Sequence, residues 1–191
     1  MLIGLTGGIG CGKSTVLSLF KEFGFGTIDC DTIGAELIEK DTHLQKELLK
    51  RWGKAILKAN REVDRKQVAA IVFRNTEELS WLEGILHPMI HSAWQQKVAA
   101  HLKNSWVIEV PLLFEKNLAH LFEQTICVTA DKNTCIERLA IRGLSTDDAQ
   151  RRMACQFPLE VKQEQASFVI SNNGTSAFLR TQVQKLILLL S

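Results

Sequence analysis

The chain has 191 residues, of which 46% are hydrophobic and 23% are charged, and its formal net charge is +2. These values are typical of one folded domain with a substantial core and room for a small insertion. The low net charge gives no argument for a nucleic-acid partner or a membrane surface. Five cysteines without a C-x-x-C pair argue against a disulfide framework or a zinc knuckle. The apolar runs are too short to cross a bilayer and no signal-peptide pattern is present, so we expect a cytoplasmic protein.

Five short apolar runs have the composition of buried strands in a parallel sheet. They lie at residues 2–6, 25–29, 106–110, 125–129 and 168–171. Segments with helical patterns are expected after residues 13, 132 and 145, over most of residues 32–103, and at the end of the chain. Within 32–103, two apolar stripes are expected: Leu44, Leu48, Leu49 and Trp52, and Leu79, Leu82, Ile85 and Leu86. Alternating strands and helices predict an α/β fold with a five-stranded parallel sheet flanked by helices.

The first predicted strand runs into GGIGCGKS at residues 7–14, which matches the phosphate-loop pattern G-x-x-x-x-G-K-[ST]. Such a loop turns its backbone N–H groups inward only where side chains do not obstruct it, which accounts for Gly7, Gly8, Gly10 and Gly12. A helix that begins at Lys13 adds its positive dipole end. Lys13 is expected to reach the β- and γ-phosphates, and Ser14 to complete a Mg²⁺ shell. The pattern predicts a nucleotide site without separating kinases from GTPases, ATPases or motors.

The residues after the second predicted strand bear on the class of enzyme. The stretch DTIG at Asp31–Gly34 fits a nucleotide-dependent switch, but no N-K-x-D guanine-reading signature is present. A small-molecule kinase fits better, because ligands of open α/β sheets bind beyond the carboxyl ends of the strands, where Asp29 and Asp31 are expected. A carboxylate there orients an attacking hydroxyl or accepts its proton. Ordinary turn and capping chemistry is the alternative for this aspartate pair.

Two arginines, Arg138 and Arg142, are expected on one face of the helix after residue 132, because they are four residues apart. Beside the break at Gly143, they suit a lid that closes over transferring phosphates. A solvated surface helix is the alternative. After the break, Ser145 and Asp148 fit the start of another helix, in the manner of a capping box.

Several stretches, in this order, resemble the dephospho-CoA kinase family: GLTGGIGCGKSTV, TIDCD, LHPMI, PLLFE, ERLAIRGLS, QFPLE and ISNNG. The resemblance implies that ATP phosphorylates the ribose 3′-hydroxyl of dephospho-CoA, the last step of coenzyme A synthesis. It also implies a core (about 1–31, 104–137 and 153–191), a helical substrate-side insert (about 32–103) and a lid (about 138–152). A kinase of another small-molecule or nucleotide acceptor remains the alternative.

The resemblance also implies roles for individual residues. Asp31 is the base or orienting carboxylate, Arg138 and Arg142 are lid arginines, and Glu109 orders the waters of a Mg²⁺ ion held by Ser14. The ATP contacts are Gly8, Gly10, Cys11, Gly12, Lys13, Ser14 and Thr15 at the phosphates, and Asn173 and Gly174 near the adenine. The implied partners are Mg·ATP and dephospho-CoA. From the composition we expect no nucleic-acid or membrane partner, and we expect a monomer or weak homo-oligomer.

This chain departs from the family pattern at a few positions. Ala35 stands where members often carry an arginine after the D-x-D, and Glu109 replaces an aspartate. Activity is expected to survive because Glu109 keeps a carboxylate, whereas Ala35 removes a possible substrate contact. His87 and His91 have a metal-pair spacing, but Pro88 between them is better explained as the first residue of a helix. Cys11 lies beside a helix N-terminus and Lys13, surroundings that favour a thiolate. The alternative is that this loop position tolerates any small residue and that the thiol has no role.

Overall fold

A computed structural model of the protein describes residues 1–101 and 104–190. The chain divides into two compact units, one formed by Met1–Asp29 with Leu102–Ser191 and the other by Cys30–His101. The predicted boundary between residues 103 and 104 and the last residue of the C-terminal helix lie outside the described residues. Within residues 1–101 and 104–190, none of the helices is both long and apolar enough to cross a membrane.

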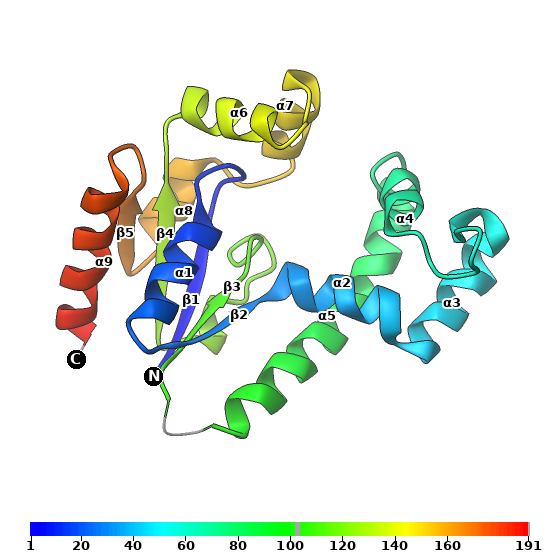
Figure 1. Ribbon diagram of the computed structural model, residues 1–191, viewed down its shortest axis with the longest axis horizontal. Helices are drawn as coiled ribbons and strands as arrows, with labels where there is room; N and C mark the ends of the chain where they lie inside the picture. The colour runs from blue at the N-terminus through cyan, green and yellow to red at the C-terminus, as the bar shows by residue number, and fades with distance from the viewer. Residues whose placement is uncertain (102–103, 191) are drawn as a thin grey trace. The chain divides into compact units, whose positions relative to one another are not determined.

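The first unit is built on a parallel sheet with the strand order β2-β3-β1-β4-β5 (Figure 1). The strands are β1 (Leu2–Gly7), β2 (Gly26–Asp29), β3 (Trp106–Glu109), β4 (Gln124–Thr129) and β5 (Phe168–Ser171). All four strand pairings are parallel, which confirms the α/β fold and the five predicted strands. Because β1 lies at the centre, the loop that follows it emerges in the middle of the carboxyl edge of the sheet.

The sheet unit contains the helices α1 (Lys13–Glu22), α6 (Lys132–Ile141), α7 (Thr146–Ala154), α8 (Leu159–Gln165) and α9 (Ser176–Leu190), with a short 3-10 turn at Ala119–Leu121. Of these helices, α1, α8 and α9 pack on the sheet. Helix α1 packs on β1, β3 and α9, whereas α8 packs on β1 and β4. The fully buried Ile3 and Leu5 of β1 lie in one cluster with Phe20 of α1 and Val183 of α9. This packing fixes the start of α1 against the sheet.

The predicted helix start at Ser145 is confirmed. The Asp148 backbone N–H donates to Ser145 Oγ at 3.2 Å, and the Ser145 hydroxyl donates to the Asp148 carboxylate at 2.8 Å. Gly143, between α6 and α7, has a φ of +83°, a conformation that glycine adopts without strain. The two helices are therefore separated by a sharp turn with its own cap.

The second unit is helical. It contains α2 (Cys30–Lys40), α3 (Thr42–Trp52), a 3-10 turn (Gly53–Ile56), α4 (Arg65–Val72) and α5 (Thr76–Ala99). Both predicted apolar stripes join one core cluster, in which Leu44 and Leu48 are fully buried and Leu82 is nearly so. The apolar residues of α3 and α5 recur at helical spacing, so each helix buries one apolar face in this cluster.

The prediction that Pro88 begins a helix is wrong, because Pro88 lies inside α5. The helix begins earlier, where the Asn75 side chain accepts hydrogen bonds from the backbone N–H groups of Glu77 and Glu78. A proline inside a helix removes one backbone hydrogen bond. The loss is tolerated here because apolar side chains of α5 on both sides of it, Leu82 and Trp94, are buried.

Candidate active site

The phosphate-loop sequence lies between β1 and α1, as its pattern requires. Gly10 and Gly12 have φ values of +82° and +89°, which strain any other residue. A Cβ at Gly10 would stand 2.8 Å from the Cys135 carbonyl oxygen, and one at Gly12 would stand 2.2 Å from Asn172 Nδ2. Neither position has room for a side chain. Both positions therefore require glycine, and the loop that they form ends at the N-terminus of α1, where the helix dipole favours a bound phosphate.

Side chains from three distant segments hold the loop in place. Gln156 Oε1 accepts a hydrogen bond from the Ile9 N–H at 3.0 Å. Asn172 Nδ2 donates to the Cys11 carbonyl at 2.9 Å. Arg138 donates to the Asn172 carbonyl at 2.9 Å and approaches the Gly10 carbonyl at 3.4 Å. The resemblance implied that the NNG turn at Asn172–Gly174 lies near the adenine, but sequence reasoning did not predict that Asn172, or Gln156 of the QFPLE stretch, contacts the phosphate loop.

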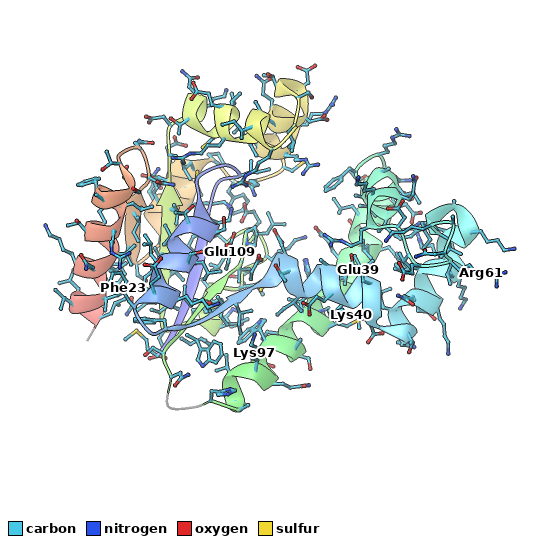
Figure 2. All side chains as sticks on the ribbon, viewed as in Figure 1. Phe23, Glu39, Lys40, Arg61, Lys97 and Glu109 are labelled. Carbon is cyan, nitrogen blue, oxygen red and sulfur yellow. The ribbon has the colours of Figure 1, made fainter. Side chains whose placement is uncertain are left out.

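Lys13 combines a buried position with several electronegative neighbours. Its Nζ lies 3.3 Å from the Gly7 and Gly8 carbonyl oxygens and 4.0 Å from Glu109 Oε1. The Lys13 and Glu109 side chains are 10% and 9% exposed. Glu109 ends β3 and pairs with Leu5 of β1 and Asp29 of β2, and Figure 2 labels it on the sheet. The structure thus brings a cation and a carboxylate together at the base of the phosphate loop.

The groups available for a divalent cation are oxygens. Ser14 and Thr15 are exposed in the first turn of α1, and Glu109 supplies a buried carboxylate on the neighbouring strand. Over the described residues, no three His, Cys, Asp or Glu side chains are grouped so that they could hold a metal ion. The donor set therefore fits Mg²⁺, which keeps several waters and shares its ligands with nucleotide phosphates.

The two predicted lid arginines differ in their placement. Arg138 points from α6 to the phosphate loop through the hydrogen bonds described above, so the alternative of a solvated helix face does not hold for it. Arg142 is the exposed C-cap residue of α6, next to Gly143. Arg138 therefore lies beside the loop, whereas Arg142 lies at the turn between α6 and α7.

The predicted adenine-side residues follow β5. The Asn173 side chain exchanges two hydrogen bonds with Asp131, accepting from its backbone N–H at 2.7 Å and donating to its carboxylate at 3.0 Å. Gly174 lies close to Phe178, which a Cβ would approach to 3.0 Å. The NNG turn is therefore fixed to the start of α6 by Asn173 and to the phosphate loop by Asn172.

Asp31 belongs to the helical unit. It is exposed in the first turn of α2, which begins at Cys30, and only Cys30 separates it along the chain from Asp29 at the end of β2. Ala35 lies one turn later in α2 and is half-buried. An acidic residue in the first turn of a helix is stabilised by the helix dipole, whatever else it does.

A buried ion pair that the sequence did not reveal joins two of the motif stretches. Lys162 of α8 is fully buried, and its Nζ lies 2.7 Å from Glu115 Oε1 and 2.9 Å from the Pro111 carbonyl oxygen. The same Glu115 oxygen accepts a hydrogen bond from the Phe157 N–H. PLLFE, at 111–115, is therefore connected to the QFPLE segment through these contacts.

The chain is similar to one family over nearly all of its length. A family model for dephospho-CoA kinase matches residues 1–177. A dephospho-CoA kinase of Bacillus cereus is 35% identical over 191 residues, covering 98% of this chain and 96% of the relative. The structure of TT1252 from Thermus thermophilus has a TM-score of 0.86 at 30% identity, covering 100% of this chain and 98% of that one. A dephospho-CoA kinase from Campylobacter jejuni has a TM-score of 0.72 at 28% identity, covering 100% and 96%.

Proposed function

Because this chain belongs to the dephospho-CoA kinase family, we propose that it transfers a phosphoryl group from Mg·ATP to the ribose 3′-hydroxyl of dephospho-CoA. The product is coenzyme A, and the reaction is the final step of its synthesis. The observation that carries the proposal is the meeting of Lys13 and Glu109 beneath a glycine loop at the carboxyl edge of the sheet. Phosphoryl transfer needs such positioning and charge neutralisation more than it needs covalent chemistry.

Each residue has a distinct proposed role. The loop N–H groups and Lys13 stabilise negative charge on the transferring phosphoryl group. Ser14 would hold a Mg²⁺ ion and the Glu109 carboxylate would orient one of its waters, and the ion would supply positive charge against the nucleotide phosphates. Asp31 orients the acceptor hydroxyl or takes its proton. The segment of about 138–152 acts as the lid, with Arg138 and Arg142 reaching the phosphates and Asn173 and Gly174 bordering the adenine.

Part of the proposal rests on composition and resemblance. We propose a cytoplasmic enzyme that acts as a monomer or weak homo-oligomer, without nucleic acid or membrane. The helical segment of about 32–103 is the substrate-side insert, and Ala35 within it weakens dephospho-CoA binding relative to an arginine. For the switch alternative, DTIG at Asp31–Gly34 remains the sequence support, whereas the family assignment favours the kinase.

The experiment that tests this function measures ADP release from Mg·ATP with dephospho-CoA, in parallel with adenosine, AMP and shikimate. We expect turnover with dephospho-CoA alone and a product heavier by one phosphate, which a 3′-nucleotidase converts back to the substrate. ATP binding without turnover on dephospho-CoA would contradict the acceptor. Preference for GTP, without acceptor-dependent release of ADP or GDP, would favour the switch.

A further inference from the structure

Two cysteines that are distant in sequence meet beneath the phosphate loop. Cys11 in the loop and Cys135 in α6 are 1% and 2% exposed, and their Sγ atoms are 3.6 Å apart. The contact joins positions 124 residues apart, so it is created by the fold. The Cys135 thiol also approaches the Ala130 carbonyl at 3.7 Å.

The backbone next to Cys11 also lies close to Cys135. A Cβ built at Gly10, next to Cys11, would lie 3.0 Å from Cys135 Cα. A disulfide has an S–S distance of about 2.0 Å, so the sulfurs need to approach each other by about 1.6 Å from their separation of 3.6 Å. Such an approach is a local adjustment within one compact unit.

A pocket borders this pair, although both residues are almost fully buried. A pocket of about 540 Å³ is lined by Cys11 and Cys135 together with Ile9, Gln156, Phe157 and Asn173. All of these residues belong to the sheet unit. A molecule the size of hydrogen peroxide fits such a space easily.

The two thiols are chemically unequal. The hydrogen bond with Cys135, helped by the positive charge of Lys13, lowers the pKa of Cys11 to about 7 despite its burial. The same hydrogen bond and burial raise the pKa of Cys135. Since the thiolate is the nucleophile, Cys11 attacks first and Cys135 is the resolving thiol.

We propose that Cys11 and Cys135 form a redox modification site, at which a hydroperoxide oxidises the pair to a disulfide. The Cys11 thiolate attacks one oxygen of hydrogen peroxide and displaces hydroxide, which leaves a sulfenic acid. The Cys135 thiol then attacks this sulfur, the S–S bond forms, and the hydroxyl group leaves as water. Overall, two thiols and one peroxide give one disulfide and two waters, with the two electrons passing from sulfur to oxygen.

The disulfide changes the geometry of the phosphate site. Bringing the two sulfurs to bonding distance moves Cys11 or Cys135. The movement disturbs neighbouring contacts, because the Cys11 carbonyl accepts a hydrogen bond from Asn172 and Gly10 packs directly on Cys135. Arg138 follows Cys135 by three residues on α6. The bond therefore shifts the loop against the helix that carries a lid arginine. A misplacement of about 1 Å in an active site costs about 10²-fold in rate, so we expect kinase activity to fall by about that factor.

The test is limited oxidation of the full chain by hydrogen peroxide. We expect intact mass to fall by two hydrogen atoms, peptide mapping to find a Cys11–Cys135 bond, and dithiothreitol to restore both mass and activity. The mapping requires no substrate, so it stands whether or not dephospho-CoA is the acceptor, whereas the activity measurement rests on the proposed function. Retention of all five thiols, or oxidation confined to the exposed Cys155, would overturn the site.

Two variants make the test specific. Cys135→Ser, which keeps the basal activity, cannot form the bond, so its Cys11 should accumulate as a sulfenic acid that dimedone traps. Cys155→Ser is the matched control and should behave as the unaltered chain does. If Cys11 of Cys135→Ser stays an unmodified thiol that dimedone does not trap under the same oxidation, Cys11 is not the attacking thiol and the pairing is overturned.

Discussion

The two compact units of this chain use polar side chains in different ways. In the sheet unit, Gln156, Asn172 and Arg138 come from distant segments and hydrogen-bond to the phosphate loop. In the helical unit, polar contacts such as the Asn75 cap and the Arg51–Glu78 ion pair serve helix ends and surfaces. We therefore expect that replacing one of these polar side chains in the sheet unit changes the geometry of the phosphate loop. In the helical unit, stability depends chiefly on the apolar cluster, and a polar substitution there affects chemistry only where the side chain acts on a substrate.

Asp31→Asn tests the main exception to this contrast: Asp31 is a polar side chain of the helical unit with a proposed catalytic role. We expect kcat to fall by about 10²–10⁴-fold, the usual loss for a missing acid–base group. The ATP dissociation constant should stay nearly unchanged, because the phosphate loop belongs to the other unit. Steady-state kinetics and equilibrium binding of ATP measure the two effects separately.

The matched control is Glu36→Gln, which removes an exposed carboxylate from the same helix. Its kcat should remain within about twofold of the unaltered chain, as for a surface substitution away from special features. Normal turnover of Asp31→Asn would retire Asp31 as the key carboxylate and assign the helical unit a purely binding role.

Lys162→Met tests whether polar contacts of the sheet unit also stabilise it. The substitution leaves the Glu115 carboxylate, which is 10% exposed, without the cation 2.7 Å away. Breaking a buried pair by removing one partner costs about 3–5 kcal/mol, so the free energy of unfolding should fall by that amount. Urea unfolding followed by tryptophan fluorescence measures the change.

The double variant Lys162→Met with Glu115→Gln is the control for this pair. Glutamine keeps an acceptor for the Phe157 N–H without leaving a buried charge. Most of the lost stability should return, because a buried ion pair often contributes little beyond a neutral replacement. A double variant as unstable as Lys162→Met would mean that the loss reflects packing of the lysine stem.

Leu48→Ala tests the apolar side of the contrast. Leu48 is fully buried in the cluster of the helical unit, so truncation should cost about 2–5 kcal/mol of unfolding free energy. ATP affinity should be unchanged under conditions where the chain is folded. Leu188→Ala, at a position 77% exposed on α9, is the control and should change stability little. Weaker ATP binding by folded Leu48→Ala would show that the two units are coupled more tightly than the contrast implies.

The same contrast explains which features of the fold and site could be predicted from the sequence. The strands, the loop and both apolar stripes were predictable, because each depends on periodicity or on a local glycine pattern. The contacts of Gln156 and Asn172 with the loop span 147 and 161 residues, and no local pattern encodes them. The Cys11–Cys135 and Lys162–Glu115 contacts were missed for the same reason. Pro88 was misassigned because the Asn75 cap and the packing of α5 outweigh a helix-breaking residue.

The smallest expected effect concerns the reactivity of the Cys11 thiol, which depends on its contact with the distant Cys135. Cys135 and Lys13 face the Cys11 thiol and lower its pKa to about 7, so its reactive thiolate increases as the pH rises through 7. The rate of modification by methyl methanethiosulfonate should therefore increase about tenfold between pH 6 and pH 8. Cys127 is an internal control: burial raises its pKa to about 12, so it should stay unmodified over this range. A Cys11 rate that is still low at pH 8 would mean that the contact between distant segments leaves the loop cysteine an ordinary buried thiol.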